Sequence, residues 1–407
     1  MSKISNLSVK NRVDALLEAS DNLLTEGTFV DDSFNIFISR DIEDIVNELN
    51  SAGVTIDEDR LRKHLDTYTK KENDAIKAFN SEVAKLGLNV NISKRKEVID
   101  LFYTQLKLPV YKATKTGPSI DSECLEVLRK LNPIPGYYAD AKSARSMINT
   151  LTNILNALRS GKIYPQHNLN KAASGRFSSG GVDKININGW SKDIRDILKA
   201  AETKVIVSFD YKNMEGAVSA SLAGQTDLIE DMANDVDLHQ QLADILGVDR
   251  KVAKIVNHGC SYGMTAFGLG RKIGCSEEEA QEFIDAYWNK RSKIRNLKQD
   301  VVHTAKMMGY IATISGFKRN SNMLSDDQIW STFIQGSAAD LFKQALVEVQ
   351  NYFKKNDNGK VLTPMHDALI CEIDSENLDA SVAAVKDIME NIHEKFTLRV
   401  DVQIGKW

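Results

Sequence analysis

Apolar residues recur along the chain with two different periods, and these periods predict where helices and strands lie. The stretch RDIEDIVNELNSAG places apolar residues at helical spacing between Ile42 and Leu49 and stops at Gly53, which predicts an amphipathic helix. Asp57 then fits the N-cap of a long polar helix. Because the apolar positions of this second helix are sparse, we expect it to project from the body of the protein.

Short apolar runs later in the chain predict strands. Val205–Phe209 is β-branched and apolar, as a buried strand would be, and Asp210 follows at its end. From Leu238 to about Tyr310 the pattern is helical throughout. VLTPMHDALICEID resembles two strands joined through Met365–Asp367, and LRVDVQIG resembles a last strand. This order predicts an α+β chain with helical insertions around a sheet.

Composition narrows the class of protein. The chain has 407 residues, enough for two or three packed subdomains, and no apolar run long enough to span a bilayer. The first residues, MSKISNLSVK, lack the apolar segment of a signal peptide. The four cysteines form no CxxC pair, which argues against a zinc site or a disulfide framework and favours a reducing, cytoplasmic setting.

Charge is distributed unevenly along the chain. Residues 1–84 hold 10 Lys and Arg against 17 Asp and Glu, whereas residues 85–199 hold 19 against 9. A basic segment beside an acidic one fits a surface that faces a polyanion. A solvated charged face explains the same counts, and the counts alone favour that simpler explanation.

The stretch DRKVAKIVNHGCSYGMTAFG carries four functional side chains at intervals of four residues: Arg250, Lys254, His258 and Tyr262. Four residues slightly exceed one helical turn, so these side chains share one broad face. Two cations one turn apart repel each other unless an anion lies over them, and a triphosphate would satisfy both. A solvated basic helix with Tyr262 in the core is the alternative, and the spacing alone favours it.

Carboxylates stand beside the predicted strands. Asp210 ends one strand and Asp367 lies at the bend of the apolar hairpin, where an unpaired charge is costly. Two such carboxylates from separate parts of a sheet would suit a two-magnesium site. A helix N-cap and a turn aspartate are the ordinary explanations. Glu215 has the ordinary explanation of an exposed carboxylate in the first turn of a helix.

Taken together, these stretches resemble the motifs of family A DNA polymerases. FDYKNMEG resembles the first palm motif of that family, RKVAKIVNHGCSYGMTAFGLGRKIG its fingers helix, and MHDALICEI its second palm motif. Five further stretches resemble the family in the same order: GVTIDEDRLRKHLD, ASGRFSS, DLHQQLADILG, GYIATISGFKR and IQGSAADLFKQAL. Each motif alone is weak, whereas eight in order, from about Phe34 to Trp407, are specific.

The resemblance implies a catalytic centre that binds two Mg²⁺ ions, with Mn²⁺ as a substitute. Asp210 and Asp367 would bind the metals, helped by the backbone carbonyl of Tyr211. Catalysis would consist mainly of positioning and charge stabilisation during attack of a primer 3′-hydroxyl on the α-phosphate. Lys254 is the candidate proton donor to the leaving pyrophosphate.

The resemblance also implies residues that bind the incoming dNTP. Arg250 and Lys254 would hold the triphosphate, with His239 nearby. Tyr262 would guard the insertion site against which the template base stacks. Glu215 would be the steric gate that excludes a ribose 2′-hydroxyl.

Contacts with primer–template DNA are implied at three further residues. Arg176 and Gln335 would touch the minor groove at the primer end, and His366 would lie near the primer terminus.

Some residues depart from the family pattern. Ala368 stands where the family usually has Glu, and Glu372 is expected to face the other side of its strand and so not to replace it. His258 replaces the Phe or Tyr that packs on the incoming sugar, which leaves a ring in the dNTP site. Asp326 and Asp327 fall where relatives commonly carry a template-binding arginine.

The implied architecture is a right-hand polymerase fold with a palm sheet, helical fingers and a helical thumb. Its expected parts are an N-terminal segment (1–40), the thumb and palm entry (41–165), the palm with the first catalytic motif (166–224), the fingers (225–323) and the palm with the second catalytic motif (324–407). Too few residues precede the matched region for a proofreading exonuclease domain, so we expect no proofreading by this chain. A separate exonuclease or processivity subunit is a candidate partner, although no residue indicates one, and a bacteriophage setting would place the protein in host cytoplasm.

Two alternative functions stay open. A single-subunit RNA polymerase shares the aspartate and Arg/Lys/Tyr-Gly framework, although the gate carboxylate of Glu215 argues against it. A duplex-binding scaffold with a decayed active site is supported by Ala368 alone.

Overall fold

The computed structural model describes residues 32–115, 117–169, 172, 174–181, 183 and 185–405, with side chains from Asp41 onward. Residues 1–31 of the expected N-terminal segment 1–40 therefore lie outside the described residues.

A four-stranded antiparallel sheet forms the centre of the fold. Its strands lie in the order β10 (Gly359–Met365), β11 (Ala368–Asp374), β7 (Lys204–Tyr211) and β12 (Val400–Ile404). The strands that the apolar runs predict are all present. Two of them, β10 and β11, form the predicted hairpin. Because sequence neighbours β10 and β11 lie beside the distant β7, the sheet joins the middle of the chain to its end.

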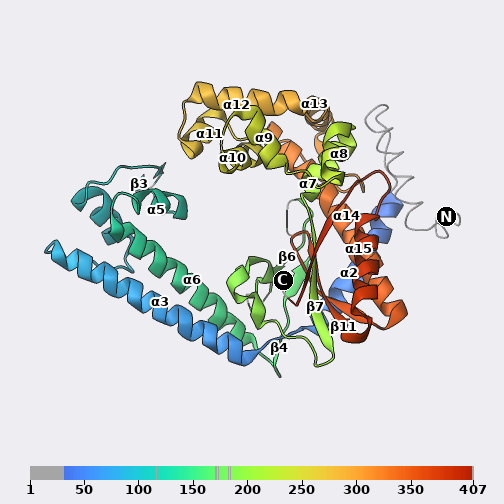
Figure 1. Ribbon diagram of the computed structural model, residues 1–407, viewed down its shortest axis with the longest axis horizontal. Coiled ribbons are helices and arrows are strands. Elements are labelled where there is room, and N and C mark those ends of the chain that lie inside the picture. Colours follow the sequence, from blue (N-terminus) through green and yellow to red (C-terminus); the bar gives the residue numbers. More distant parts are fainter. Residues whose placement is uncertain are drawn as a thin grey trace.

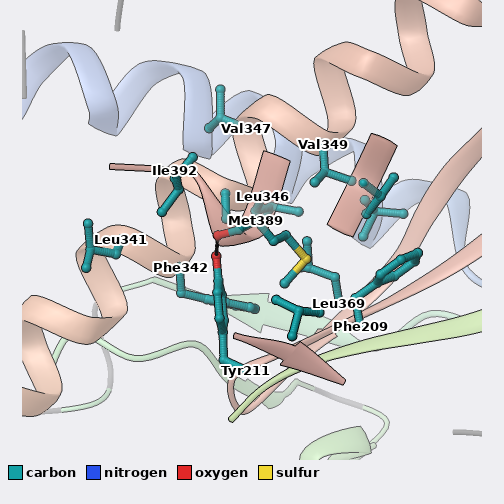
Figure 2. Close-up of a cluster of buried hydrophobic side chains, with 14 of the residues drawn as sticks. Phe209, Tyr211, Leu341, Phe342, Leu346, Val347, Val349, Leu369, Met389 and Ile392 are labelled. Atoms are coloured by element: carbon teal, nitrogen blue, oxygen red, sulfur yellow. Dashed lines mark hydrogen bonds between the residues drawn. The ribbon is translucent and has the colours of Figure 1, made fainter. Parts of the chain in front are cut away.

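Three helices cover one face of the sheet (Figure 1): α2 (Asp32–Ala52), α14 (Asp326–Asn356) and α15 (Leu378–Glu390). Side chains alternate along β7, so Phe209 and Tyr211 point into this core while Asp210 between them points to the opposite face. The Tyr211 hydroxyl donates a hydrogen bond to the Met389 carbonyl at 2.8 Å, which satisfies the one polar atom it brings into the core (Figure 2). This packing fixes the register of β7 and hence the direction of Asp210.

The opposite face of the sheet packs against a second core. Ile206 of β7 and Ile370 of β11 pack there against Trp190 and Ile197, in the segment that holds the short 3₁₀ helices η2 (Ile187–Gly189) and η3 (Lys192–Ile197). Asp210 lies on this face near the end of β7, where it is partly exposed.

Two long antiparallel helices, α3 (Glu58–Lys85) and α6 (Pro133–Ala157), project from the sheet (Figure 1). We call them the helical pair. Asp57 caps α3 by accepting from the Arg60 N–H at 3.0 Å, as the sequence predicts. The expectation of a projecting helix is confirmed, although α6 covers its apolar stripe. At the base of the pair, β1 (Val54–Thr55) pairs with β4 (Lys162–Ile163).

The far end of the helical pair carries a small subdomain, residues 86–132, which we call the tip. Phe102, Leu125 and Leu128 are buried in a core that the tip shares with the ends of α3 and α6. Its elements are α4 (Arg95–Asp100), the π-helix η1 (Leu101–Gln105), β2 (Ala113–Thr114), β3 (Gly117–Pro118) and α5 (Ser122–Leu128).

Helices dominate residues 214–308, as the periodicity predicts. Helix α7 (Met214–Ala223) packs against α13 and α14, and the rest form what we call the helical lobe: α8 (Thr226–Ala233), α9 (Leu238–Leu246), α10 (Arg250–Ser261), α11 (Ala266–Ile273), α12 (Glu277–Lys290) and α13 (Ser292–Met308). Short elements complete the chain: β5 (Gln166–Asn168) pairs with β6 (Ser178–Gly180), β8 (Tyr310–Ala312) pairs with β9 (Lys318–Asn320), and η4 (Ser375–Asn377) precedes α15.

The described residues contain no helix that is both long and apolar enough to cross a membrane. The four cysteines are free thiols, three of them buried.

Candidate functional site

The sheet brings two carboxylates together that lie far apart in the chain. Asp210 is the penultimate residue of β7, and Asp367 lies in the two-residue turn between β10 and β11. Ala368, next to Asp367, pairs directly with Asp210, and the Tyr211 N–H donates to the Asp367 carbonyl at 3.2 Å. The turn is tight because His366 adopts a left-handed conformation with φ of 56°. The hairpin thus fixes Asp367 beside the end of β7.

The pKa of Asp210 is shifted by partial burial and by neighbouring charges. This pKa is raised from 3.8 to about 6, first by partial burial and then by the charges of Asp367 and Asp401, while Arg195 and Lys192 of η3 act in the opposite direction. Asp401 pairs with Asp210 across β12 and so shares its face of the sheet. Repulsion between carboxylates on one face is what a bound cation would relieve.

The raised pKa of Asp210 predicts how stability depends on pH. Because the folded-state pKa lies above the unfolded value, the contribution is fully present below about pH 4 and is lost as pH rises through about pH 6. Without divalent metal, we expect Asp210→Asn to raise Tm over the wild type at about pH 8 and to leave it unchanged at about pH 4. Thermal unfolding at both pH values checks this, and an equal Tm difference at both would contradict it.

Ala368 leaves the neighbourhood of Asp210 with a buried methyl group in place of a carboxylate. The expected orientation of Glu372 is wrong: because Asp367 lies in the turn and outside the strand, Glu372 shares the face of Ala368 and Asp210. Glu372 still does not replace the missing group, because it lies four residues along β11 from Ala368, about 13 Å. Its carboxylate accepts from the Ala201 N–H at 2.9 Å and pairs with Lys360.

Helix α10 carries the predicted basic face. Arg250 begins the helix and donates to Asp237, the N-cap of α9, at 2.7 Å. Lys254 is exposed one turn later, and no ion pair of the described residues involves it. The imidazole rings of His239 and His258 lie 5.6 Å apart.

Both histidines have lowered pKa values, to which burial and the neighbouring cations contribute. Burial lowers the pKa of His258 first and the Lys254 charge adds to it. Burial likewise lowers the pKa of His239, followed by His258 and Arg250. The structure therefore gathers Arg250, Lys254, His258 and His239 into one cationic cluster, in which the histidines are held neutral at neutral pH.

A hydrogen-bonded chain connects the end of α10 to the sheet. The Tyr262 hydroxyl donates to the Glu215 carboxylate at 2.6 Å, and Arg176 forms an ion pair with the same carboxylate. Burial, followed by Glu215, raises the pKa of Tyr262 to about 12, and Gln335 lies within hydrogen-bonding reach of its hydroxyl.

Two adjoining hollows share these residues. A cavity of about 100 Å³ is lined in part by Glu215, His258 and Tyr262. A smaller one is lined in part by Arg176, Glu215, His366 and Asp367. Glu215 borders both hollows, so the predicted residues that line them lie on either side of it.

Gly263 is required where α10 ends. Its φ is 76°, and a Cβ atom there would lie 2.0 Å from the Asp327 carboxyl carbon. Asp327 is paired with Lys298 of α13 at 2.6 Å, and Asp326 pairs with Lys306. The two aspartates that replace the expected arginine are thus held by neighbouring lysines.

Several charged residues near Asp210 were missed by sequence reasoning. Asp401 also pairs with Lys212 at 3.0 Å, and Lys212 pairs in turn with Asp235. The polar–apolar alternation in LRVDVQIG could have placed Asp401 on the polar face of its strand. Nothing in the sequence could have shown which strand lies beside it.

The donor set around Asp210 fits a hard divalent cation. Carboxylate and carbonyl oxygens are the ligands that Mg²⁺ prefers. Within the described ranges no group of three or more His, Cys, Asp or Glu side chains is arranged to hold a metal, so a cation here would depend on the aspartate pair together with water or substrate oxygens.

Comparison with known proteins adds to this geometry. The model of DNA polymerase family A matches residues 62–407. The chain is 30% identical to DNA polymerase I of Caldicellulosiruptor bescii, over 90% of this chain and 46% of that protein, and 27% identical to the thermostable DNA polymerase I of Thermus aquaticus, over 91% and 47%. The chain therefore spans about half the length of the curated relatives it matches.

A solved structure resembles most of this fold. It is the POL domain of Pol1 from M. smegmatis in complex with DNA primer-template and dNTP, with a TM-score of 0.83 and 25% identity. The match covers 90% of this chain and 69% of that one.

Proposed function

Because the chain belongs to DNA polymerase family A, we propose that it is a template-directed DNA polymerase that adds deoxynucleotides to a primer 3′ end. The observation that carries this proposal is that the β10–β11 hairpin holds Asp367 beside Asp210 at the end of β7. The antiparallel sheet with its two helical projections is consistent with a right-hand fold. In these terms the sheet is the palm, the helical pair with its tip is the thumb, and the helical lobe forms the fingers.

Asp210 and Asp367 would hold two Mg²⁺ ions, with the Tyr211 carbonyl as a further ligand. The metals would activate the primer 3′-hydroxyl and stabilise the charge on the leaving pyrophosphate. The protein positions the carboxylates through the β10–β11 hairpin and through the core packing of Tyr211.

The cationic cluster on α10 would bind the triphosphate of the incoming dNTP. Arg250 offers a planar fork of donors and Lys254 a compact charge, with His239 beside them. His258 keeps an aromatic ring at the place where relatives pack Phe or Tyr on the sugar. Because burial and its cationic neighbours hold His258 neutral, it would stack without adding charge.

Glu215 would act as the steric gate, and its environment supports this role. Its carboxylate is fixed from two sides by Arg176 and Tyr262, so it cannot swing aside at low cost to admit a 2′-hydroxyl. Arg176 and Gln335 would contact the minor groove, and His366 the primer terminus. A separate exonuclease or processivity subunit and a cytoplasmic location remain predictions from the sequence.

Replacing the gate is expected to relax sugar selection. In Glu215→Ala we expect the preference for dNTP over NTP to fall by about 10²-fold, because discrimination by one polar contact is of that order. The matched control is Glu230→Ala, which removes an exposed carboxylate from α8. The measurement is kcat/KM for single dNTP and NTP additions to a primer. An unchanged ratio in Glu215→Ala would remove Glu215 from sugar selection.

Primer extension with dNTPs and NTPs in separate reactions tests the proposed function against the RNA polymerase alternative. The proposal expects efficient extension with dNTPs only. Efficient NTP use by the wild type would favour the RNA polymerase.

A further inference from the structure

The tip of the helical pair contacts the helical lobe across a long sequence separation. Tyr111 lies in the tip and Arg271 near the end of α11, 160 residues later. The Tyr111 hydroxyl donates to the Arg271 carbonyl at 3.3 Å, and the Arg271 guanidinium donates to the Tyr111 carbonyl. These two reciprocal hydrogen bonds join segments that otherwise belong to different projections of the fold.

Aromatic rings reinforce the same contact. The guanidinium carbon of Arg271 lies 4.9 Å from the ring centroid of Tyr111 and 5.7 Å from that of Phe267, one turn earlier on α11. A guanidinium within this distance of two rings makes favourable cation–π contacts. Phe267 is 58% exposed, so its ring is available at the surface for this contact.

The contact is small and open to solvent, so it can break and re-form. Arg271 is exposed and Tyr111 only half-buried. Exposed cation–π contacts and solvent-accessible hydrogen bonds contribute modestly, because water competes for the same groups. Such a contact is weak enough to open reversibly, unlike a permanent interface between subunits. We call it the latch.

The latch joins two projections that extend from different parts of the fold. Figure 1 shows the helical pair at the left and the helical lobe across the top, with the tip close to α11. The sheet, with Asp210 and Asp367, lies at the base between them. With Tyr111 against Arg271, the chain forms a closed circuit from the sheet through the pair, tip and lobe and back to the sheet.

We propose that Tyr111 and Arg271 form a reversible latch that closes this circuit around duplex DNA, so that the bound primer–template is enclosed. Duplex enters while the latch is open, and latch closure then opposes its sideways escape. This inference rests on the proposed function, because a DNA polymerase carries duplex over the aspartate pair, but it adds a topological property that catalysis itself does not require.

A cross-link across the latch tests enclosure directly. Tyr111→Cys and Arg271→Cys are combined in a Cys275→Ser background, because Cys275 is only partly buried while the other three cysteines are buried. The protein is bound to a gapped circular plasmid, or to the same plasmid linearised, and then treated with a short bismaleimide. Each sample is washed with concentrated salt, which dissociates electrostatic complexes.

Enclosure predicts that cross-linked protein stays on the circle, leaves the linear plasmid, and is released when the retained circle is cut. The Tyr111→Cys variant in the same background, treated identically, should wash off both. If cross-linked protein washed off the circular and the linear plasmid equally, the latch would be overturned. A cross-link that forms only in the absence of DNA would overturn it as well. Failure of the wild type to bind the gapped plasmid at all would instead remove the proposed function.

A second variant measures the latch without a cross-linker. We expect Arg271→Ala to dissociate from a primer–template about fivefold faster than the wild type, as loss of one exposed cation–π contact predicts. Arg295→Ala, which removes an exposed arginine from α13, is the matched control. Equal dissociation rates of Arg271→Ala and the wild type would contradict the latch.

Discussion

Asp210→Asn and Asp367→Asn are each expected to lower the rate of nucleotide addition by about 10³-fold or more, the largest effect that this account predicts. Each change keeps the size of the side chain but removes a negative charge that the metals need. Binding of duplex DNA should persist, because neither aspartate carries the positive charge that attracts phosphates. Single-turnover extension of a primer, with DNA binding measured in parallel, checks both expectations.

Asp300→Asn is the matched control, because Asp300 is an exposed carboxylate on α13 away from the sheet. Its extension rate should equal that of the wild type. If wild type and Asp210→Asn both failed to extend a primer while both bound duplex, the scaffold alternative would be correct. A fully active Asp210→Asn variant would refute the role of the aspartate pair.

Lys254→Met is expected to give the second largest effect, a loss of about 10²- to 10⁴-fold in the maximal rate, as the removal of a general acid predicts. Lys254 is exposed on the same face of α10 as Arg250 and His258, where the pyrophosphate would leave. Affinity for dNTP should fall much less, because Arg250 still binds the triphosphate. Rapid-quench kinetics over a range of dNTP concentrations separates the two quantities.

Lys355→Met is the matched control for this prediction, since Lys355 is exposed near the end of α14, which covers the face of the sheet opposite Asp210. It should change neither quantity. If Lys254→Met lowered rate and affinity by the same factor, Lys254 would serve only to bind the nucleotide.

Local patterns were sufficient to predict most of the elements around the site. The apolar run 205–209, the hairpin around Asp367 and the four-residue spacing on α10 all depend on neighbours in sequence, which is why their structures follow from periodicity. The contact between Asp210 and the hairpin could be expected only through the family resemblance, because strand order is a long-range property.

Contacts between residues that long-range strand pairing brings together could not be predicted from the sequence. Asp401 lies opposite Asp210 only because β12 returns beside β7. The Tyr262–Glu215–Arg176 chain joins three separate segments, and the fixed state of Glu215 could not be inferred from any one of them. The error over Glu372 arose because the parity rule for strands was applied across a turn residue.

The most direct test of the central claim is primer extension by the wild type on a defined template with each dNTP supplied alone, with and without Mg²⁺. The account predicts that only the dNTP complementary to the next template base is added, and only when Mg²⁺ is present. Addition that ignores the template base, or that proceeds equally after all divalent metal has been chelated, would contradict it.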